Sequence, residues 1–187
     1  LSVVAMSAAE PLFRWIEPDA RQVVYDRVDF YVLLGRHLLV VGIAAVVTIV
    51  VGVAAGVAVT RTRGADFLPL VGQLASLGQT FPPVAVLALS VPVLGFGTLP
   101  IIVALMLYGL LPIVRNTLAG LQEVDNTIKS AAHAMGMTPT QTLRQVELPL
   151  AAPVILAGIR TATVWTVGIA TLATLVGQPC LGNYIFE

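Results

Sequence analysis

The chain has 187 residues, of which 57% are hydrophobic and 11% charged, and its formal net charge is zero. Soluble domains carry about 25% charged residues, so this deficit and a mean hydropathy of +0.92 indicate a membrane protein. The balanced charge provides no basic field for nucleic acid, and the single cysteine, Cys180, excludes an intrachain disulfide.

Residues 1–36 mix acidic, basic and aromatic side chains. This composition favours an extramembrane or interfacial N-terminal segment with local helix. Residues 37–187 are dominated by long apolar runs, and we interpret them as an all-α transmembrane domain of about four spans.

The first expected span is Leu38–Val59, which contains no charged residue and is long enough to cross a bilayer. Gly52 and Gly56 form a small-xxx-small pair, which we interpret as helix packing and not as a sign of a particular dimer. Arg61 and Arg63 follow directly and mark the cytoplasmic end, because basic residues gather on that side.

Two further spans are expected from Phe67 to Val91 and from Ile101 to Leu118, because no charged residue occurs from Phe67 to Val114. The loop between them is expected around Val93–Leu99. Four prolines and glycines mark it: Pro92, Gly95, Gly97 and Pro100.

The earlier of these spans is interrupted by Gln79, Thr80, Pro82 and Pro83. Prolines remove backbone donors and break a helix, and within lipid the freed groups need protein or a watery cavity. The segment is therefore a candidate lining of a translocation path. A simple kink, with the polar side chains bonded to neighbouring helices, is an equally good interpretation.

The last expected span is Leu150–Val176, where Thr163, Thr166 and Thr174 lie near one helical face. The default interpretation is that these hydroxyls bond within their own helix as part of helix packing. The more specific interpretation is that they line a polar path. Arg160 is the only charge in the span. A charge inside a membrane often has a function, but we favour snorkelling or structural pairing for this one.

A polar stretch, Asp125 to Pro149, separates the apolar runs and predicts two short helices joined by a tight turn. The signals are Asp125 as a first cap, Gly136 as a left-handed stop, and a second start at Thr138, Pro139 and Gln141. Four apolar residues share one face of the first helix: Ile128, Ala131, Ala132 and Met135. The stretch is too short and polar to span a bilayer, so we expect it at the membrane surface, bound by a partner.

Catalytic chemistry is not indicated by the sequence. A phosphate-binding loop of the G-x-x-x-x-G-K-[ST] type does not occur, and Lys129 is the only lysine. His37 and His133 lack the partners that a metal site needs, and no nucleophile elbow occurs. We therefore expect no enzyme activity, no metal and no bound cofactor.

The polar stretch resembles the cytoplasmic "EAA" loop of ABC-importer inner-membrane permease subunits. The family pattern is Glu-Ala-Ala, three residues, Gly, nine residues and Ile-x-Leu-Pro. The matching positions are Ser130, Ala131, Ala132, Gly136, Val146, Leu148 and Pro149. The spacing agrees throughout, while Ser130 stands in place of Glu and Val146 in place of Ile.

Three other segments resemble the glycine betaine, choline and carnitine osmoprotectant permeases within this binding-protein-dependent, MetI-like family. They are residues 79–85, 108–117 and 147–162, and the resemblance extends from about Leu33 to the C-terminus. The family continues into another membrane helix, so we expect the chain to be a fragment that lacks a terminal helix or helices.

The resemblance implies the bundle of a type I importer, with a cytoplasmic coupling loop at residues 119–149, in the bacterial inner membrane. It implies a cytoplasmic ABC ATPase dimer that binds ATP, a second permease subunit, and a periplasmic or lipid-anchored solute-binding protein, all acting in a lipid membrane. The alternatives are an importer of amino acids such as methionine, or a membrane scaffold without transport.

Overall fold

The computed structural model describes residues 2–16, 18, 28–61, 64–77 and 80–186, and within these ranges it contains helices and no strand. The elements in chain order are α1 (Ser2–Ile16), α2 (Phe30–Val59), η1 (Ala65–Phe67), α3 (Leu68–Leu77), α4 (Pro83–Leu94), α5 (Thr98–Gln122), α6 (Asn126–Ala134), α7 (Pro139–Thr142), η2 (Leu143–Glu147), α8 (Leu148–Ile169), η3 (Ala170–Val176) and α9 (Asn183–Phe186). The all-α prediction is confirmed.

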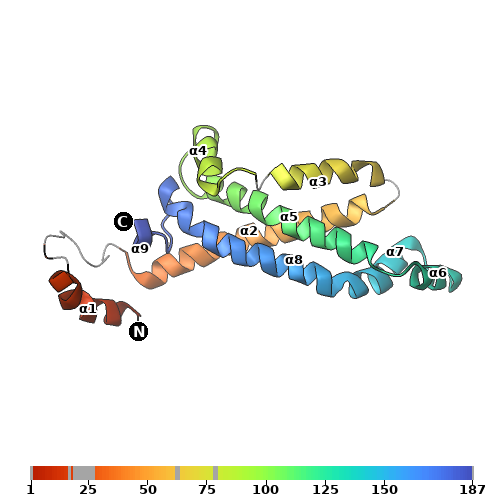
Figure 1. Ribbon diagram of the computed structural model, residues 1–187, viewed down its shortest axis with the longest axis horizontal. Helices are drawn as coiled ribbons and strands as arrows, with labels where there is room; N and C mark the ends of the chain where they lie inside the picture. Colours follow the sequence, from red (N-terminus) through yellow and green to blue (C-terminus); the bar gives the residue numbers. More distant parts are fainter. Residues whose placement is uncertain (1, 17, 19–27, 62–63, 78–79, 187) are drawn as a thin grey trace.

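Three long helices, α2, α5 and α8, run side by side along the long axis of the molecule, with α5 in contact with both of the others (Figure 1). In the described part of the chain, the stretches long and apolar enough to cross a membrane are Phe30–Val59, Thr98–Gln122 and Pro139–Val176. The first of these begins before residue 37, so the helix starts within the segment expected to be extramembrane.

Glycine positions on α2 allow α5 to approach closely. A Cβ atom on Gly52 would lie 2.7 Å from Cγ2 of Ile113, and one on Gly56 would lie 2.6 Å from Cγ2 of Thr117. Both distances are too short for real atoms, so only glycine fits. This confirms the interpretation of the pair as helix packing inside the subunit.

The contact between α5 and α8 also depends on glycines, which have no side chain to keep the two helices apart. A Cβ on Gly158 would lie 2.6 Å from Cβ of Asn116, and one on Gly120 would lie 3.0 Å from the Ala151 carbonyl oxygen. Helices in lipid have no hydrophobic driving force to associate, so such close van der Waals packing is what holds this pair together.

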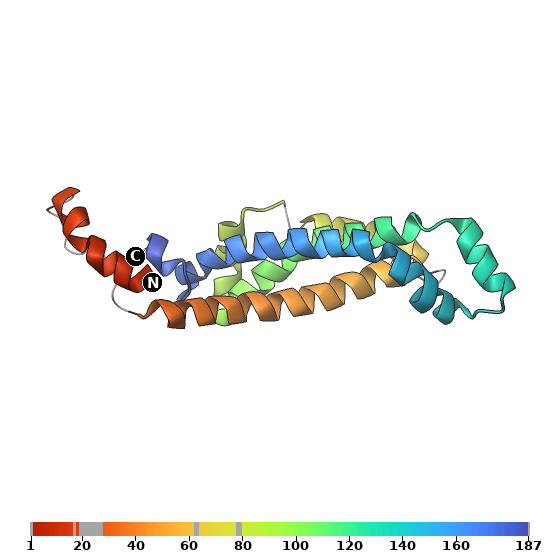
Figure 2. The same ribbon diagram turned by 90° about the horizontal axis from the view of Figure 1, so that it is seen from below.

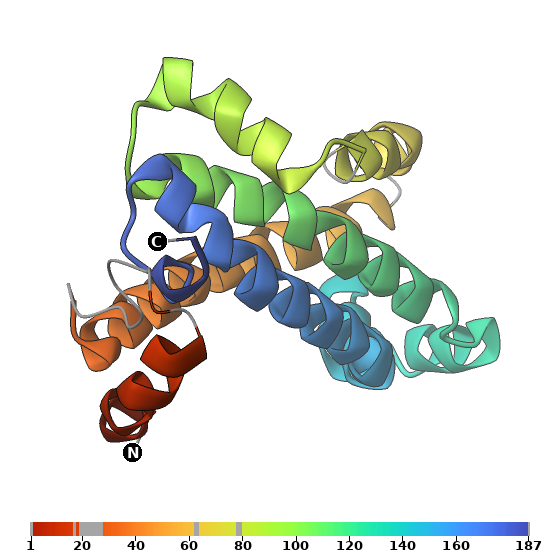
Figure 3. The same cartoon turned by 60° about the vertical axis from the view of Figure 1, so that its left-hand side comes forward.

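The expected break in the second span is present, because α3 ends before Thr80 and α4 begins at Pro83. The region that the sequence counts as one span is therefore two short helices. In Figure 1 α3 runs along α5 and α4 is seen nearly end-on, whereas in Figure 3 α4 is seen at full length and α3 nearly end-on, so the two short helices point in different directions. The next loop is shorter than expected, since Pro92 lies in the last turn of α4 and Pro100 in the first turns of α5.

The break leaves one backbone oxygen to be satisfied, and α5 supplies its partner. Tyr108 is 5% exposed, and its hydroxyl donates a hydrogen bond to the carbonyl oxygen of Phe81. The Pro83 ring has no N–H and the α4 ladder starts from the Pro82 carbonyl, so Phe81 lies outside the helical pattern. The tyrosine thus keeps a polar group from being stranded in an apolar layer.

The glycine contact between α2 and α5 leads to a stability prediction. We expect Gly56→Ala to lower the free energy of unfolding by about 1–3 kcal/mol, because its new methyl group must displace the buried Thr117 side chain. Gly42→Ala is the matched control on the same helix, since nothing lies within 4 Å of its Cβ position. Thermal unfolding in detergent measures both, and equal midpoints would contradict the packing role.

The Tyr108 hydroxyl leads to a second prediction. Tyr108→Phe keeps the ring but leaves the Phe81 carbonyl without its donor, so we expect a loss of about 1–3 kcal/mol in unfolding free energy. Tyr31→Phe is the control, because that side chain is 69% exposed. A Tyr108→Phe variant as stable as the control would show that the break is satisfied in another way.

Candidate functional site

The polar stretch forms a compact element at one end of the bundle, which we call the coupling element (residues 123–149). Its first helix, α6, starts where predicted: the Asp125 carboxylate accepts a hydrogen bond of 2.7 Å from the Thr127 backbone N–H. This bond holds the pKa of the Asp125 carboxyl below its ordinary value. Lys129 Nζ donates to the Leu121 carbonyl oxygen at 3.3 Å and so joins α6 to the end of α5.

The turn between the two helices is made by Gly136, whose φ of +84° lies in the left-handed region. The Gly136 N–H bonds to the His133 carbonyl at 2.9 Å, and the Met137 N–H bonds to the Ala132 carbonyl at 3.1 Å. These two bonds form a Schellman motif and satisfy carbonyls at the end of α6. The predicted left-handed stop is confirmed.

The second helix starts with the predicted capping box. The Gln141 N–H donates to Thr138 Oγ1 at 3.3 Å, the Thr138 N–H donates to Gln141 Oε1 at 2.8 Å, and Pro139 occupies the first turn. The predicted helix pair is thus present, but its second member is not a separate short helix. α7 continues through η2 into α8.

Pro149 explains the irregular join. It has no N–H and its ring crowds the carbonyl four residues earlier, so it disfavours regular α-helix in the turn before it. The chain widens into a π-helical turn, Leu143–Glu147, in which the Leu148 N–H bonds to the Leu143 carbonyl. Such turns keep a helix continuous while the bonding pattern shifts.

The apolar face predicted for α6 is largely open. Ile128 is 43% exposed and Met135 75% exposed, and Ala131 is also exposed, whereas Ala132 is buried. Ser130, at the position of the family's carboxylate, points to an exposed surface. In the final motif, Val146 and Leu148 are half-buried and Pro149 is exposed. On the apolar face of α6, Ala132 is therefore buried and the other three side chains are available for contact.

One ion pair fixes the coupling element to the rest of the bundle. Arg61, just after α2, donates to the Glu147 carboxylate through both of its terminal nitrogens, at 3.2 and 2.5 Å. Glu147 is 6% exposed. The Thr60 hydroxyl accepts from Arg61 at 3.1 and 3.2 Å and helps to orient the guanidinium.

Sequence reasoning missed this pair. The sequence indicates Arg61 only as a residue that marks the cytoplasmic end of the first span. The usable signal was the position of Glu147 directly before a long apolar helix, where a carboxylate needs a partner. Nothing in the sequence identified Arg61, which is 86 residues away, as that partner.

The ion pair and the coupling element lie at the same end of the long helices, opposite the Gly95–Gly97 loop (Figure 2). Arg61 therefore lies at the same end of the bundle as the coupling element, as expected from the sequence. Arg63, the second residue used for that expectation, lies outside the described residues.

Of the residues expected at the helix break, Thr80 lines a hollow of about 690 Å³ between α3 and α5, together with Arg115 and Ser76. Arg115 Nη2 donates to Ser76 Oγ at 3.4 Å within it. Pro82 and Pro83 start α4, with Pro82 exposed and Pro83 half-buried. Gln79 lies outside the described residues.

The threonines of the last span turn mostly toward their own subunit. Thr166 is 1% exposed and packs beside Thr48 and Gly109, in a crevice with no room for a water molecule. Thr163 is half-buried, and its hydroxyl donates to the Ile159 carbonyl at 2.8 Å. Thr174, further along in η3, is also half-buried.

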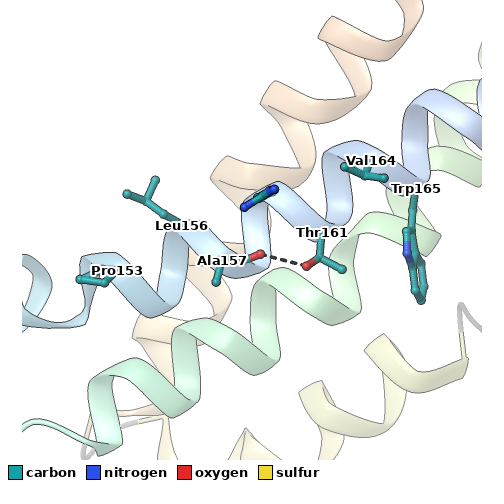
Figure 4. Close-up of a pocket in the computed structure, with 7 residues that line it drawn as sticks. Pro153, Leu156, Ala157, Thr161, Val164 and Trp165 are labelled. Carbon is teal, nitrogen blue, oxygen red and sulfur yellow. Dashed lines mark hydrogen bonds between the residues drawn. The ribbon is translucent and has the colours of Figure 1, made fainter.

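A shallow hollow of about 630 Å³ follows the outer face of α8. All of its lining residues come from that helix: Pro153, Leu156, Ala157, Arg160, Thr161, Val164 and Trp165 (Figure 4). No other element of the described part of the chain lines this hollow, which carries the one charge of the span. Structural pairing of Arg160, one of the two favoured interpretations, is not seen within the described part of the chain.

These features define a polytopic helical membrane protein with an exposed helix-turn-helix at one end. The family model for the inner membrane component of binding-protein-dependent transport systems matches residues 48–187, and the chain belongs to that family. It is therefore a permease component of the bacterial inner membrane and not a catalytic enzyme.

Curated relatives agree. The osmoprotectant import permease protein OsmY of Salmonella typhimurium is 47% identical over 160 residues, which cover 86% of this chain and 68% of the relative. The glycine betaine/carnitine/choline transport system permease protein OpuCB of Bacillus subtilis is 45% identical over 153 residues, covering 81% and 69%.

Solved structures share the fold. An inward-facing form of the MetNI methionine ABC transporter superposes with a TM-score of 0.68 at 26% identity, covering 79% of this chain and 74% of that one. The predicted membrane bundle of an ABC importer is confirmed.

The Arg61–Glu147 pair yields a prediction on stability. Arg61→Gln or Glu147→Gln alone should lower the unfolding free energy by about 1.5–3 kcal/mol, because each leaves the other group without its charged partner. In the double variant we expect less than the sum of the two losses, with a coupling energy of about 1–3 kcal/mol. Unfolding of all four proteins in detergent measures the cycle, and additive losses would contradict a direct interaction.

Proposed function

We propose that this permease imports small compatible solutes, of the glycine betaine, choline or carnitine type, as one subunit of an ATP-driven importer. The single observation that carries the proposal is the coupling element: an exposed, capped helix-turn-helix fixed by an ion pair to the membrane core. The solute class is supported by the relatives, which are named as osmoprotectant, choline and carnitine permeases.

The coupling element is the proposed docking site for a cytoplasmic ABC ATPase dimer, which binds and hydrolyses the ATP. Ile128, Ala131 and Met135 present an exposed apolar face on a short helix, which suits insertion into a groove of a partner. The spacing of the family pattern supplies the turn at Gly136 and the final segment at Val146, Leu148 and Pro149. Ser130 and the buried Ala132 complete the predicted set.

The other proposed partners are a periplasmic or lipid-anchored binding protein, which delivers the solute, and a second permease subunit, identical or different. The second subunit is proposed because the crevice between α2, α5 and α8 at Thr48, Gly109 and Thr166 has no room for a water molecule and so offers no path there. The proposed path runs between subunits and is lined in part by residues of the break and the last span: Thr80, Pro82, Pro83, Thr163 and Thr174. Thr166, although predicted for this path from the sequence, is buried inside the subunit and is left out of the proposal.

A methionine-type amino-acid importer is the second candidate, and it is favoured by the likeness to the MetNI structures. The higher identity to the osmoprotectant permeases favours the first candidate. A scaffold without transport explains the exposed coupling element but not the broken α3–α4 segment.

Uptake by the assembled importer tests the proposal. The chain is reconstituted in vesicles with its ATPase, second permease subunit and binding protein, and radiolabelled glycine betaine, carnitine, choline and methionine are offered in turn. ATP-dependent uptake of a quaternary ammonium solute supports the first candidate. Uptake of methionine alone, or of none of the four, would refute it.

Gly136 gives a direct test of coupling. A β-branched side chain cannot adopt its φ of +84° without strain, so Gly136→Val should redirect α6 and lower the solute imported per ATP hydrolysed by about tenfold. Gly95→Val is the matched control, because Gly95 has a φ of +77° in open space at the other end of the bundle. Simultaneous uptake and ATPase measurements give the ratio, and an unchanged ratio would remove the turn from the mechanism.

A further inference from the structure

The last helical segment of the expected final span, η3, is an unusually long 3₁₀-helix. It comprises seven residues, Ala170–Val176, and directly continues α8. Helices of this kind have poorer hydrogen-bond geometry than α-helices and rarely exceed three or four residues. The sequence of η3, ATLATLV, contains no glycine or proline, so its own residues do not prevent α-helix. Contacts with the rest of the chain therefore select the 3₁₀ form.

The buried side chains of η3 follow the period of a 3₁₀-helix. Ala170 is 1% exposed, Ala173 1% and Val176 3%. At three residues per turn they form one row, and they belong to the same core cluster as Val41 of α2 and Leu105 of α5. In an α-helix the six steps from Ala170 to Val176 would leave the two side chains about 120° apart, so Val176 would turn out of this core.

Two hydrogen bonds join the end of η3 to the start of α5, and we call this contact the clasp (residues 97–98 and 176–178). The Gly97 N–H donates to the Val176 carbonyl oxygen at 2.8 Å. The Thr98 hydroxyl donates to Oε1 of Gln178 at 2.6 Å. The clasp lies at the end of the bundle opposite the coupling element (Figure 2).

The segment after the clasp folds back and holds the first turn of η3. The thiol of Cys180, which is 2% exposed, donates to the Thr171 carbonyl oxygen at 3.4 Å. Gly182 lies against the same carbonyl, since a Cβ atom at this position would overlap its oxygen. η3 is thus fixed by contacts at both of its ends.

A change of η3 from 3₁₀-helix to α-helix would release the clasp. The rise per residue falls from about 2.0 to about 1.5 Å, so the six steps from Ala170 to Val176 would shorten by about 3 Å. A hydrogen bond does not survive such a displacement of its acceptor. Because α8 leads directly into η3, a movement of α8 acts on this segment without an intervening loop.

We propose that η3 is a two-state element of the transport cycle. Its 3₁₀ form, with the clasp closed, seals the outer end of the subunit, and its α-helical form releases the clasp and opens that end to the incoming solute. The proposal rests on the proposed function, import driven from the coupling element. The closed clasp agrees with the likeness to an inward-facing form of MetNI, since a path open on the inner side is closed on the outer one.

A reversible bridge across the clasp tests whether it opens. Thr98→Cys and Gln178→Cys are combined in the complete importer in vesicles and joined with a short bis-methanethiosulfonate. We expect the bridge to lower glycine betaine uptake about tenfold or more, because passage needs the open state, and a reductant to restore it. Each single variant, treated with the same reagent, controls for labelling at one position and at the buried Cys180.

The bridging yield gives a second readout of the same protein. It should be high without nucleotide and fall severalfold when a non-hydrolysable ATP analogue and the solute-loaded binding protein are present. A bridged importer that transports as fast as the reduced one, or a yield that the analogue leaves unchanged, would overturn the proposal. A wild-type importer that carries none of the offered solutes would refute the proposed function, whereas a working wild type with an indifferent bridge would refute the clasp alone.

Thr98→Val tests the side-chain bond of the clasp, because it removes the hydroxyl and keeps the shape. Since clasp opening and ATP binding are linked, the importer should bind the ATP analogue about two- to tenfold more tightly, the factor that one neutral hydrogen bond contributes. Thr161→Val is the matched control, because the Thr161 hydroxyl bonds within α8, to the Ala157 carbonyl at 3.0 Å. Equal affinities in the two variants and the wild type would remove the clasp from the gating step.

Discussion

Satisfaction of backbone polar groups without water is the constraint on which the rest of this structure depends. In lipid each free N–H or carbonyl is expensive, so spanning segments must be helical and every interruption needs a partner. The break before Pro83 is accepted because the Tyr108 hydroxyl bonds to the Phe81 carbonyl. Pro149 is accepted because a π-helical turn shifts the bonding pattern ahead of it. These two departures from regular helix are thus each matched by a specific compensating feature.

The same constraint explains why the threonine hydroxyls of α8 bond within their own helix and do not point into an open path. A hydroxyl in an apolar layer needs an acceptor, and the nearest is the carbonyl one turn back in its own helix. Thr163 and Thr166 both donate to α8 carbonyls, at 2.8 and 2.9 Å, and Thr166 is buried against α5. Arg160 differs from these threonines: within the described residues it has no hydrogen-bond or ion-pair partner, and its side chain is exposed.

Local chemistry made the turn and the caps of the coupling element predictable. Asp125, Gly136 and the Thr138–Gln141 box act on backbone groups within a few residues, so their spacing carries the information. The helix break was predictable for the same reason, since proline acts on its own turn. The Arg61–Glu147 pair and the Tyr108–Phe81 bond were not, because they join residues far apart in the chain and depend on how helices pack. Some helix boundaries also differ from those expected from the sequence. Pro92, for example, was expected in a loop but lies in the last turn of α4.

Continuity between the coupling element and α8 connects the proposed docking site with η3, which follows α8 directly. α7, η2 and α8 form one uninterrupted helical stretch, so a displacement of the turn at Gly136 is passed along α8 rather than absorbed in a loop. The Arg61–Glu147 pair holds the base of that stretch against the end of α2. A force applied at the proposed docking site would therefore be transmitted along α8 into the membrane part of the helix, because no loop lies between α7 and α8.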